Sequence, residues 1–253
     1  MKSFIVPNCP ILNIRIDNLS MNEVLDRIRQ GFIVTPNVDH LIRLQQDEEF
    51  FQAYNSADYR LCDSQILLRS ARFLGLRLKE KISGSDLFPA FCKFHAKNPA
   101  IRLFLLGGAA DSPRRAAYKI NREAGREMVV GGYSPPFGFE HDPIECDRII
   151  EMIREAGATV LAVGVGAPKQ EKWIAKHRDR LPFIQIFMAI GATIDFEAGN
   201  ISRAPRWVQS SGLEWLYRLS AEPGRLWRRY LIHDPPFFWL ILKQRLGLYR
   251  SPF

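Results

Sequence analysis

Short apolar runs alternate with helix signals along the first 200 residues of the chain. Ser20 and Glu23 have the spacing of a capping box, and Asp111 and Asp142 each stand shortly before a proline, as is typical of helix starts. The apolar runs have the length and composition of buried strands. They cover residues 12–16, 32–35, 58–62, 101–106, 128–130, 159–164 and 184–190. This alternation predicts an α/β fold: a Rossmann-like, largely parallel sheet with helices on both faces.

The pattern changes after about residue 200. Residues 203–230 have the character of helices rich in Trp and Arg, and Pro235-Pro236 separates them from the apolar run 237–242. We therefore expect two parts. Residues 1–200 form the α/β domain, and residues 201–253 form a C-terminal helical appendage rich in basic and aromatic side chains.

Most of the net charge of +8 lies in this C-terminal part, where residues 203–253 hold nine Lys or Arg and three acidic residues. Such an excess indicates an anionic partner: nucleic acid, a phosphorylated substrate or a membrane surface. Arg225, Arg228 and Arg229 share one helical face, and Arg218 would share it in a continuous helix. Interleaved Trp and Tyr suit a helix lying on an anionic bilayer. A solvated basic face is the alternative, and no recognised nucleic-acid module accompanies the patch.

Several classes of protein are not indicated. The run 237–242 is far shorter than the roughly 20 residues that cross a bilayer, and the N-terminus lacks the pattern of a signal peptide. The four cysteines form no CxxC pair, and the five histidines show no zinc-ligand spacing. We expect a cytoplasmic protein with reduced cysteines and no metal site.

Polar residues follow two of the predicted strands, at the edge where parallel sheets bind ligands. Asp63 has two interpretations: a base that takes the proton of a hydroxyl nucleophile, or the N-cap of the next helix. Thr35 and Asn37 have the polarity to bind a sugar or a phosphate. Turn and capping chemistry explains the Thr35-Pro36-Asn37 segment about as well.

Glycine turns follow two further strands, at Gly107-Gly108 and at residues 164–166. Glycines there let a phosphate approach backbone amides, although neither turn is a complete dinucleotide fingerprint or Walker loop, and a tight turn is the alternative. Asp195 either contacts a ribose or has a structural role, as a cap or as the partner of Arg203. The chain has no Asp-x-Asp metal clamp, which favours metal-independent handling of a diphosphate.

Several strings together resemble the WecG/TagA/CpsF family of glycosyltransferases, over about residues 11–230. The strings are Thr35-Pro36-Asn37, Ile82-Ser83-Gly84-Ser85-Asp86-Leu87, Gly164-Val165-Gly166-Ala167-Pro168-Lys169-Gln170-Glu171-Lys172-Trp173, Gly191-Ala192-Thr193-Ile194-Asp195-Phe196, Arg203-Ala204-Pro205, Gly212-Leu213-Glu214-Trp215-Leu216-Tyr217-Arg218-Leu219 and Glu222-Pro223 with Arg225-Leu226-Trp227-Arg228-Arg229-Tyr230. Residues after Tyr230 are not aligned with the family and are interpreted as an extension whose apolar run deepens membrane contact.

The resemblance implies an inverting, metal-independent glycosyltransferase without a cofactor. Such an enzyme moves a sugar from a UDP-sugar to a polyprenyl-diphosphate-linked saccharide, at the inner face of the cell membrane, in surface polysaccharide biosynthesis. A donor of the N-acetylmannosamine type is the first candidate, and UDP-glucose or a UDP-uronic acid is the alternative. The implied partners are the donor, the lipid-linked acceptor and the anionic membrane surface, with a homo-oligomer as an option and no nucleic acid.

The resemblance also implies roles for individual residues. Asp63 corresponds to the catalytic base, with Thr35 and Asn37 beside it, and Ser64 stands where the family usually has glycine. The expected donor-binding residues are Gly107, Gly108, Gly132, Gly164, Gly166, Lys169, Gln170 and Asp195. The residues expected at the lipid diphosphate or the membrane are Arg218, Arg225, Arg228 and Arg229.

Two other classes of protein compete with this interpretation. A non-catalytic nucleotide- or nucleic-acid-binding protein would use the basic C-terminal part and would consume no sugar nucleotide. A nicotinamide-dependent dehydrogenase would need the dinucleotide fingerprint, which is incomplete here.

Overall fold

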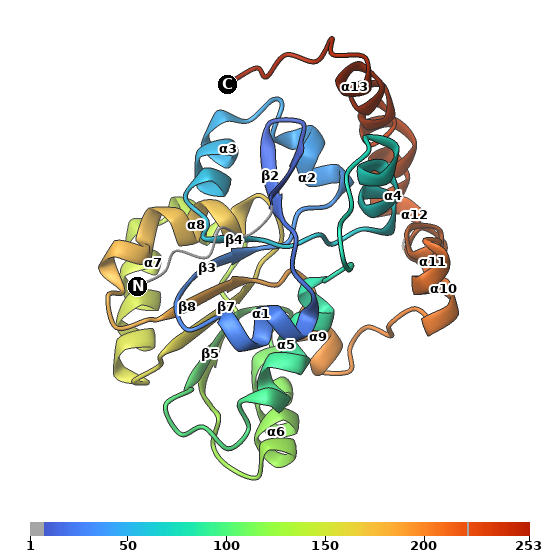
Figure 1. Ribbon diagram of the computed structural model, residues 1–253. Helices are drawn as coiled ribbons and strands as arrows, with labels where there is room; N and C mark the ends of the chain where they lie inside the picture. Colours follow the sequence, from blue (N-terminus) through green and yellow to red (C-terminus); the bar gives the residue numbers. More distant parts are fainter. Residues whose placement is uncertain (1–7, 222) are drawn as a thin grey trace.

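The central feature of the fold is a six-stranded, all-parallel sheet (Figure 1). The computed structural model describes residues 8–221 and 223–253, without the side chains of Arg206, Gln209, Ser210, Arg218, Ala221 and Arg225. In order across the sheet, the strands are β4 (Tyr59–Arg60), β3 (Gly31–Val34), β8 (Ile186–Ala189), β7 (Val160–Gly164), β5 (Leu103–Gly107) and β6 (Val129–Tyr133). The predicted fold class is confirmed.

Helices cover both faces of this sheet, because successive strand residues point to opposite sides and nearly all of them are apolar. On one face lie α2 (Val38–Arg43), α3 (Glu48–Asn55), α4 (Gln65–Phe73), α7 (Pro143–Glu155) and α8 (Lys169–His177). On the other face lie α1 (Met21–Arg27), α5 (Gly84–Phe94), α6 (Ser112–Ala124) and α9 (Thr193–Glu197). Two short 3₁₀ helices, Phe139–His141 and Arg178–Arg180, complete the body.

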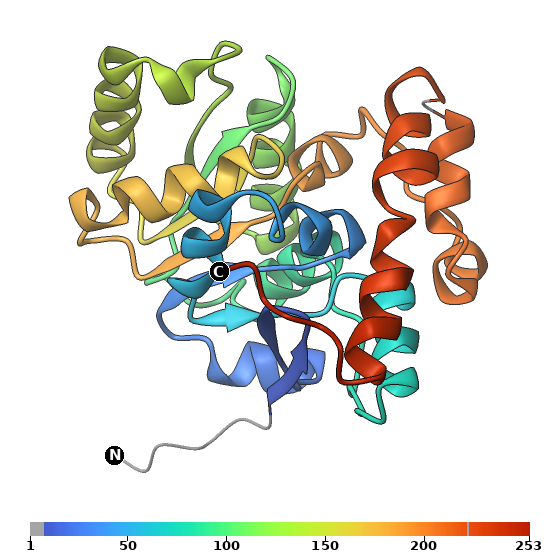
Figure 2. The ribbon, with the colours of Figure 1, turned by 90° about the horizontal axis from the view of Figure 1, so that it is seen from above.

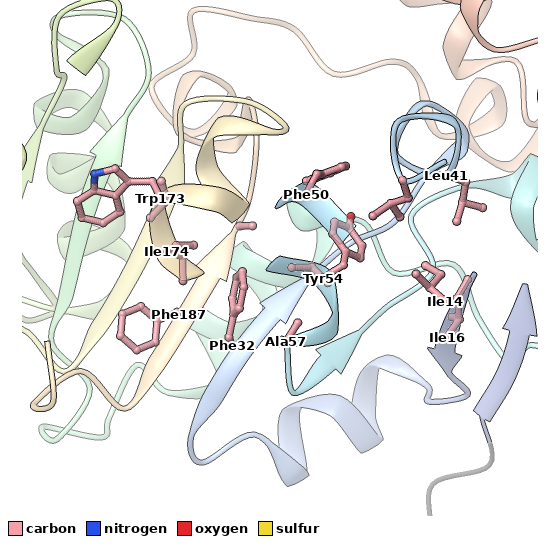
Figure 3. Packing of buried hydrophobic residues seen from close by; sticks show 14 of the residues in the cluster. Ile14, Ile16, Phe32, Leu41, Phe50, Tyr54, Ala57, Trp173, Ile174 and Phe187 are labelled. Atoms are coloured by element: carbon pink, nitrogen blue, oxygen red, sulfur yellow. The ribbon is translucent and has the colours of Figure 1, made fainter. Parts of the chain in front are cut away.

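Each face of the sheet has its own apolar core. Figure 3 shows the first, in which Phe32 and Phe187 of the sheet lie near Tyr54 of α3 and Trp173 of α8. The second core contains the alternate strand residues together with side chains of α1, α5, α6 and α9, for example Phe88. The sheet is therefore packed on both faces, and the loops at its carboxyl edge start from a rigid sheet.

The first predicted strand, residues 12–16, is not part of the parallel sheet. It covers the turn and most of the second strand of a separate antiparallel hairpin, β1 (Asn8–Ile11) and β2 (Ile14–Asp17). Leu12 occupies the turn with φ of 52°, so the apolar run continues through a reversal of the chain. The hairpin buries Ile11, Ile14 and Ile16 in the first core.

The predicted helix starts are mostly confirmed. Ser20 and Glu23 form the capping box of α1, and the Asp142 side chain accepts hydrogen bonds from the amides of Ile144 and Glu145. Asp111 precedes α6 but makes no capping hydrogen bond, because its carboxylate forms an ion pair with Arg114.

The C-terminal helices lie along one side of the body, in orange and red (Figures 1 and 2). They are α10 (Arg206–Ser211), α11 (Glu214–Ala221), α12 (Pro223–Arg228), the π-helix Arg229–His233 and α13 (Pro236–Arg245). α13 is tied to the body, because Phe237 and Ile241 are buried in the first core. The Gln244 side chain also accepts a hydrogen bond from the Leu12 amide at 2.8 Å. Within the described ranges 8–221 and 223–253, no helix has the combined length and apolarity needed to cross a bilayer.

Candidate active site

A cavity of about 290 Å³ lies between the carboxyl ends of β3 and β4 and the C-terminal helices. From the body it is lined by Asn37, Val38, Asp39, Asp63, Ser64, Gln65, Ile66 and Lys81. From the C-terminal helices it is lined by Gly212, Glu214, Trp215, Arg229, Tyr230, Asp234 and Phe238. The cavity therefore brings together three of the expected site residues, Asn37, Asp63 and Arg229.

Asp63 reaches the cavity because two loops are joined through their backbones. β4 is parallel to β3, and the Asp63 amide donates a hydrogen bond to the Pro36 carbonyl at 2.9 Å. Asp63 is not the N-cap of α4. Ser64 is the N-cap, and its Oγ accepts a hydrogen bond from the Leu67 amide at 3.3 Å. The capping interpretation of Asp63 is wrong, and Asp63 is one of the residues that line the cavity.

The identity of Ser64 follows from this arrangement. The position begins a helix, where serine satisfies a free amide and glycine is only a few tenths of a kcal/mol worse. The serine found here in place of the usual family glycine is therefore compatible with the same local backbone.

Lys81 is a cavity residue that the sequence did not single out. The Ile82 amide donates to the Cys62 carbonyl at 2.7 Å, which holds this segment beside Asp63. The Lys81 Nζ lies 3.0 Å from Asp86 Oδ2. Burial acts to lower the pKa of Lys81, but Asp63, Asp86 and Glu214 together raise it, so the ammonium stays charged.

Asp86 connects this cation to the start of the C-terminal part. Its carboxylate accepts hydrogen bonds from Ser83 Oγ and Lys81, and it ion-pairs with Arg203. Burial opposes ionisation, but these donors outweigh it and lower the pKa of Asp86 to about 2. Arg203 thus pairs with Asp86, and the interpretation in which it pairs with Asp195 is wrong.

Asn37 has both a structural contact and a cavity position. Its Oδ1 caps α2 by accepting from the His40 amide at 3.1 Å, and Arg229 Nη2 lies 3.5 Å from the same oxygen. Arg229 Nη2 is also 3.6 Å from Asp39 Oδ2, which contacts Arg43 Nε at 3.0 Å. These contacts attach the π-helix to the start of α2. Thr35 is buried directly after β3 and does not line the cavity.

The expected donor-site glycines lie farther along the same edge of the sheet. Gly107 and Gly164 are register partners, and a Cβ on Gly107 would stand 2.5 Å from the Gly164 carbonyl oxygen. Gly107 and Gly108 have φ of 118° and 79°, which side chains rarely tolerate. Asp195 Oδ1 lies beside Gly108 and accepts hydrogen bonds from the Ala109 amide at 2.9 Å and from Ser112 Oγ. This carboxylate fixes the turn after β5.

Gln170 and Glu171 lie in the first turn of α8, which follows β7 at the carboxyl edge of the sheet. Gln170 is buried, and its Oε1 accepts a hydrogen bond from the Gly191 amide at 3.1 Å. Its Nε2 donates to Glu171 Oε1 at 2.9 Å. Lys169 points elsewhere, with its Nζ 2.9 Å from Glu140 Oε1 and 4.1 Å from the centre of the Phe137 ring.

The remaining expected residues are placed as follows. Gly166 has φ of 86° and open space around it, whereas Gly132 lies inside β6, where a Cβ would stand 2.8 Å from the Pro113 Cβ. Packing against α6 is sufficient to explain Gly132. Arg228 is exposed, with its guanidinium 5.4 Å from the Trp227 ring centre. The side chains of Arg218 and Arg225 lie outside the described part of the structure.

Sequence reasoning missed part of the cavity. It assigned no role to Lys81 or Asp234, and it considered Asp39 only as an alternative to Asn37 as the cap of α2. The only sequence signal for Lys81 is its place directly before the Ile82-Ser83-Gly84-Ser85-Asp86 string. Among the residues that the structure describes, no group of three or more His, Cys, Asp or Glu side chains is arranged to hold a metal ion.

The comparison with protein families covers nearly the whole chain. The model described as "Glycosyl transferase WecG/TagA/CpsF family" matches residues 9–251. The match includes residues 231–251, so the segment after Tyr230 is not a foreign extension. The edge of the sheet with its carboxylate, its glycine turns and its C-terminal helices therefore belongs to a member of the WecG/TagA/CpsF glycosyltransferase family.

Proposed function

We propose that this protein is an inverting glycosyltransferase that moves a sugar from a UDP-sugar to a polyprenyl-diphosphate-linked saccharide. Its family is one of glycosyltransferases of polysaccharide biosynthesis. The observation that carries the finer proposal is the position of Asp63. It is a carboxylate with no capping role, in a cavity that also contains the cations Lys81 and Arg229. A base beside fixed positive charge suits the attack of a hydroxyl on a diphosphate-linked sugar.

The proposed reaction is a single displacement. The acceptor hydroxyl gives its proton to the Asp63 carboxylate, and its oxygen forms a bond to the anomeric carbon. The bond from that carbon to the UDP oxygen breaks, and UDP leaves with the electron pair, so the anomeric configuration inverts. Cationic side chains and backbone amides stabilise the negative charge that grows on the leaving diphosphate.

We place the donor at the turns after β5, β7 and β8. Gly107, Gly108 and Gly164 let these turns pack closely, since a Cβ on any of them would stand 2.5 to 2.9 Å from a neighbouring atom. Gly166 and Gly191 have open space around them, which leaves a ligand access to the backbone, and Gln170 fixes the turn at Gly191. We propose that the transfer needs no metal or other cofactor. A donor of the N-acetylmannosamine type is the first candidate on family grounds, with UDP-glucose and a UDP-uronic acid as alternatives.

We place the lipid-linked acceptor in the cavity below the C-terminal helices. Arg229 supplies a cation inside this cavity, and Arg228, Lys243 and Arg250 supply charge on the neighbouring surface. Exposed apolar side chains near these cations include Trp227, Trp239 and Leu246. This combination suits peripheral contact with an anionic membrane surface, on its cytoplasmic side.

The substitution Asp63→Asn tests the base. We expect the rate of transfer to fall about 10²- to 10⁴-fold, the usual contribution of a general base. The affinity for UDP should stay within about twofold, since Asp63 follows β4 and the donor turns follow β5, β7 and β8. UDP release is measured with UDP-N-acetylmannosamine, its uronic acid or UDP-glucose, with a farnesyl-diphosphate-linked disaccharide as acceptor.

The matched control is Asp179→Asn, which removes one carboxylate from a side chain that is 95% exposed on the body. The control should transfer sugar at the wild-type rate. Transfer by Asp63→Asn at the wild-type rate would refute the role of Asp63 as base. Failure of the wild-type protein to release UDP from any of the three donors, with added Mg²⁺ or with EDTA, would contradict the proposed function.

A further inference from the structure

The turn between α12 and α13 is a π-helix, and it brings two charged residues into the cavity together. The Asp234 amide donates a hydrogen bond to the Arg229 carbonyl at 2.8 Å, which closes a turn across five residues. In this wide turn Arg229 and Asp234 lie on the same side, and both line the cavity. Single π-helical turns are rare and often occur at functional sites.

Asp234 is a buried carboxylate with an unsatisfied oxygen. The residue is 8% exposed, and its Oδ1 has no hydrogen-bond partner among the residues described. Burial raises the pKa of Asp234 to about 6, with Asp39 adding to this effect and Arg229 and Arg43 opposing it. A buried oxygen without a partner is unfavourable for the free protein. Asp234 also lines the cavity, so its carboxyl group stands where a ligand would bind.

An ion pair with Arg229 does not explain why Asp234 lies here. Within the described part of the chain, Arg229 ion-pairs with Asp39 at 3.6 Å, and its Nη2 also reaches Asn37. The Nε of Arg229 is buried without a partner, like Oδ1 of Asp234. The turn therefore places an acidic and a basic side chain in the same wall of the cavity, and neither is fully paired within the described part of the chain.

The remaining wall next to this turn is aromatic. Trp215, Tyr230 and Phe238 line the cavity, and the rings of Trp215 and Tyr230 are 5.9 Å apart at an angle of 65°. A wall of rings with a few aimed polar groups suits a ligand that has both apolar faces and hydroxyl groups, as a saccharide has. Asp63 opens into the same cavity.

We propose that Asp234 is a substrate-binding residue, which accepts a hydrogen bond from a hydroxyl group of the acceptor saccharide. This inference rests on the proposed function, because it assigns the cavity to the lipid-linked acceptor. Asp234 holds the saccharide from the side of the C-terminal helices, whereas Asp63 takes the proton of the attacking hydroxyl on the side of the sheet. The C-terminal helices thereby contribute to recognition of the acceptor saccharide in addition to contacting its diphosphate.

The test compares two probes that differ only in the saccharide. Binding of a farnesyl-diphosphate-linked disaccharide and of farnesyl diphosphate is measured by tryptophan fluorescence and by calorimetry, on the full chain. In Asp234→Ala, the Kd for the saccharide probe should rise about 10- to 100-fold, the range for a hydrogen bond to a charged group. The Kd for farnesyl diphosphate should change less than about twofold.

Asp234→Asn keeps the shape of the side chain and one acceptor oxygen, so it should fold and lose less affinity than Asp234→Ala for the saccharide probe. Asp179→Asn is the charge control and should bind both probes like the wild-type protein. Equal losses for the two probes in Asp234→Ala, or wild-type affinity for the saccharide probe in both variants, would overturn the inference. So would a wild-type protein that binds neither probe.

The transferase assay separates this inference from the proposed function. A wild-type protein that transfers sugar while Asp234→Ala keeps its acceptor KM would leave the function in place and remove the role of Asp234. A wild-type protein without transferase activity would remove the function, and the two-probe comparison would still decide what Asp234 binds.

Discussion

Asp63 and Ser64 illustrate how two neighbouring residues divide two tasks. Both residue types are good N-caps, and only one cap is needed at the start of α4. Ser64 supplies it, and Asp63 lines the cavity without acting as a cap. Asp86, in contrast, has a structural role, because its carboxylate contacts Ser83, Lys81 and Arg203. Two aspartates near one cation thus differ in role through their contacts.

Glu171 is a carboxyl group whose ionisation we expect to change near neutral pH. It is fully buried on α8, and one oxygen, Oε2, has no hydrogen-bond partner in the described structure. Burial raises its pKa from 4.5 to about 7, although the hydrogen bond from Gln170 lowers it. The folded protein therefore retains a proton on Glu171 over a pH range in which the unfolded chain has lost it.

Replacement of Glu171 by Gln should remove a pH dependence of stability. Because the pKa is raised in the folded state, the stability associated with this group is present below about pH 4.5 and is lost as pH rises through about 7. The shift corresponds to about 3 kcal/mol. Glu171→Gln resembles the protonated form and can still accept from Gln170. Relative to wild type, its free energy of unfolding should therefore increase between pH 4.5 and 7.5, as measured by urea denaturation.

Glu127→Gln, on an exposed loop, is the control and should track the wild-type protein at every pH. A difference between Glu171→Gln and wild type that does not change with pH would show that Glu171 is ionised to the same extent in the folded and unfolded states.

At the scale of elements, α13 is part of the folded body and not a loose tail. Phe237 is fully buried and Ile241 is 4% exposed, both in the core that also contains strands β3, β5, β7 and β8. Gln244 accepts a hydrogen bond from the Leu12 amide and donates one to the Pro10 carbonyl, both in the hairpin. The Tyr249 hydroxyl donates to Gln45 Oε1 at 2.7 Å. The N-terminal hairpin and the last helix therefore support each other.

Truncation of the Phe237 side chain should show this support. Phe237→Ala is expected to lower the free energy of unfolding by about 3 to 5 kcal/mol, the usual cost of removing a buried phenylalanine. Trp239→Ala, two residues along the same helix and 57% exposed, should cost less than about 1 kcal/mol. Chemical denaturation of both variants provides the measurement. Equal and small effects would mean that α13 adds little to the stability of the body.

Features that depend on residues close in sequence were predicted correctly, whereas features that depend on residues far apart in sequence were missed. Local chemistry predicts the strands β3 to β8, the capping box at Ser20 and the cap at Asp142, because each depends on residues close in sequence. The hairpin turn at Leu12 was missed, since an apolar run does not reveal a reversal inside it. Lys81 and Asp234 were missed for a different reason. They are far apart in sequence and line one cavity only after the C-terminal helices pack on the body, which no local pattern records.

The whole molecule joins a nearly neutral body to a basic, aromatic C-terminal side. Of the net charge of +8, residues 203–253 carry +6. Exposed apolar side chains lie on the same side, including Trp239 and Leu246, and Lys243 Nζ is 5.5 Å from the Trp239 ring centre. Deletion of residues 203–253 is a poor test of membrane contact, because it would also remove Phe237 and Ile241 from the core. Exposed side chains are the better target.

The double substitution Trp239→Ser and Leu246→Ser should weaken binding to phosphatidylglycerol vesicles on the order of 10-fold or more, because it removes two apolar side chains that would enter the interface. Flotation of the full chain with vesicles measures this. The wild-type protein should bind phosphatidylglycerol more strongly than phosphatidylcholine, and 0.5 M salt should reduce the difference, since each basic residue near the surface contributes about 1 kcal/mol. Tyr118→Ser, on α6 and 71% exposed, is the matched control and should float like the wild type. Equal flotation of the double variant and the wild type would show that this side of the molecule does not contact the bilayer.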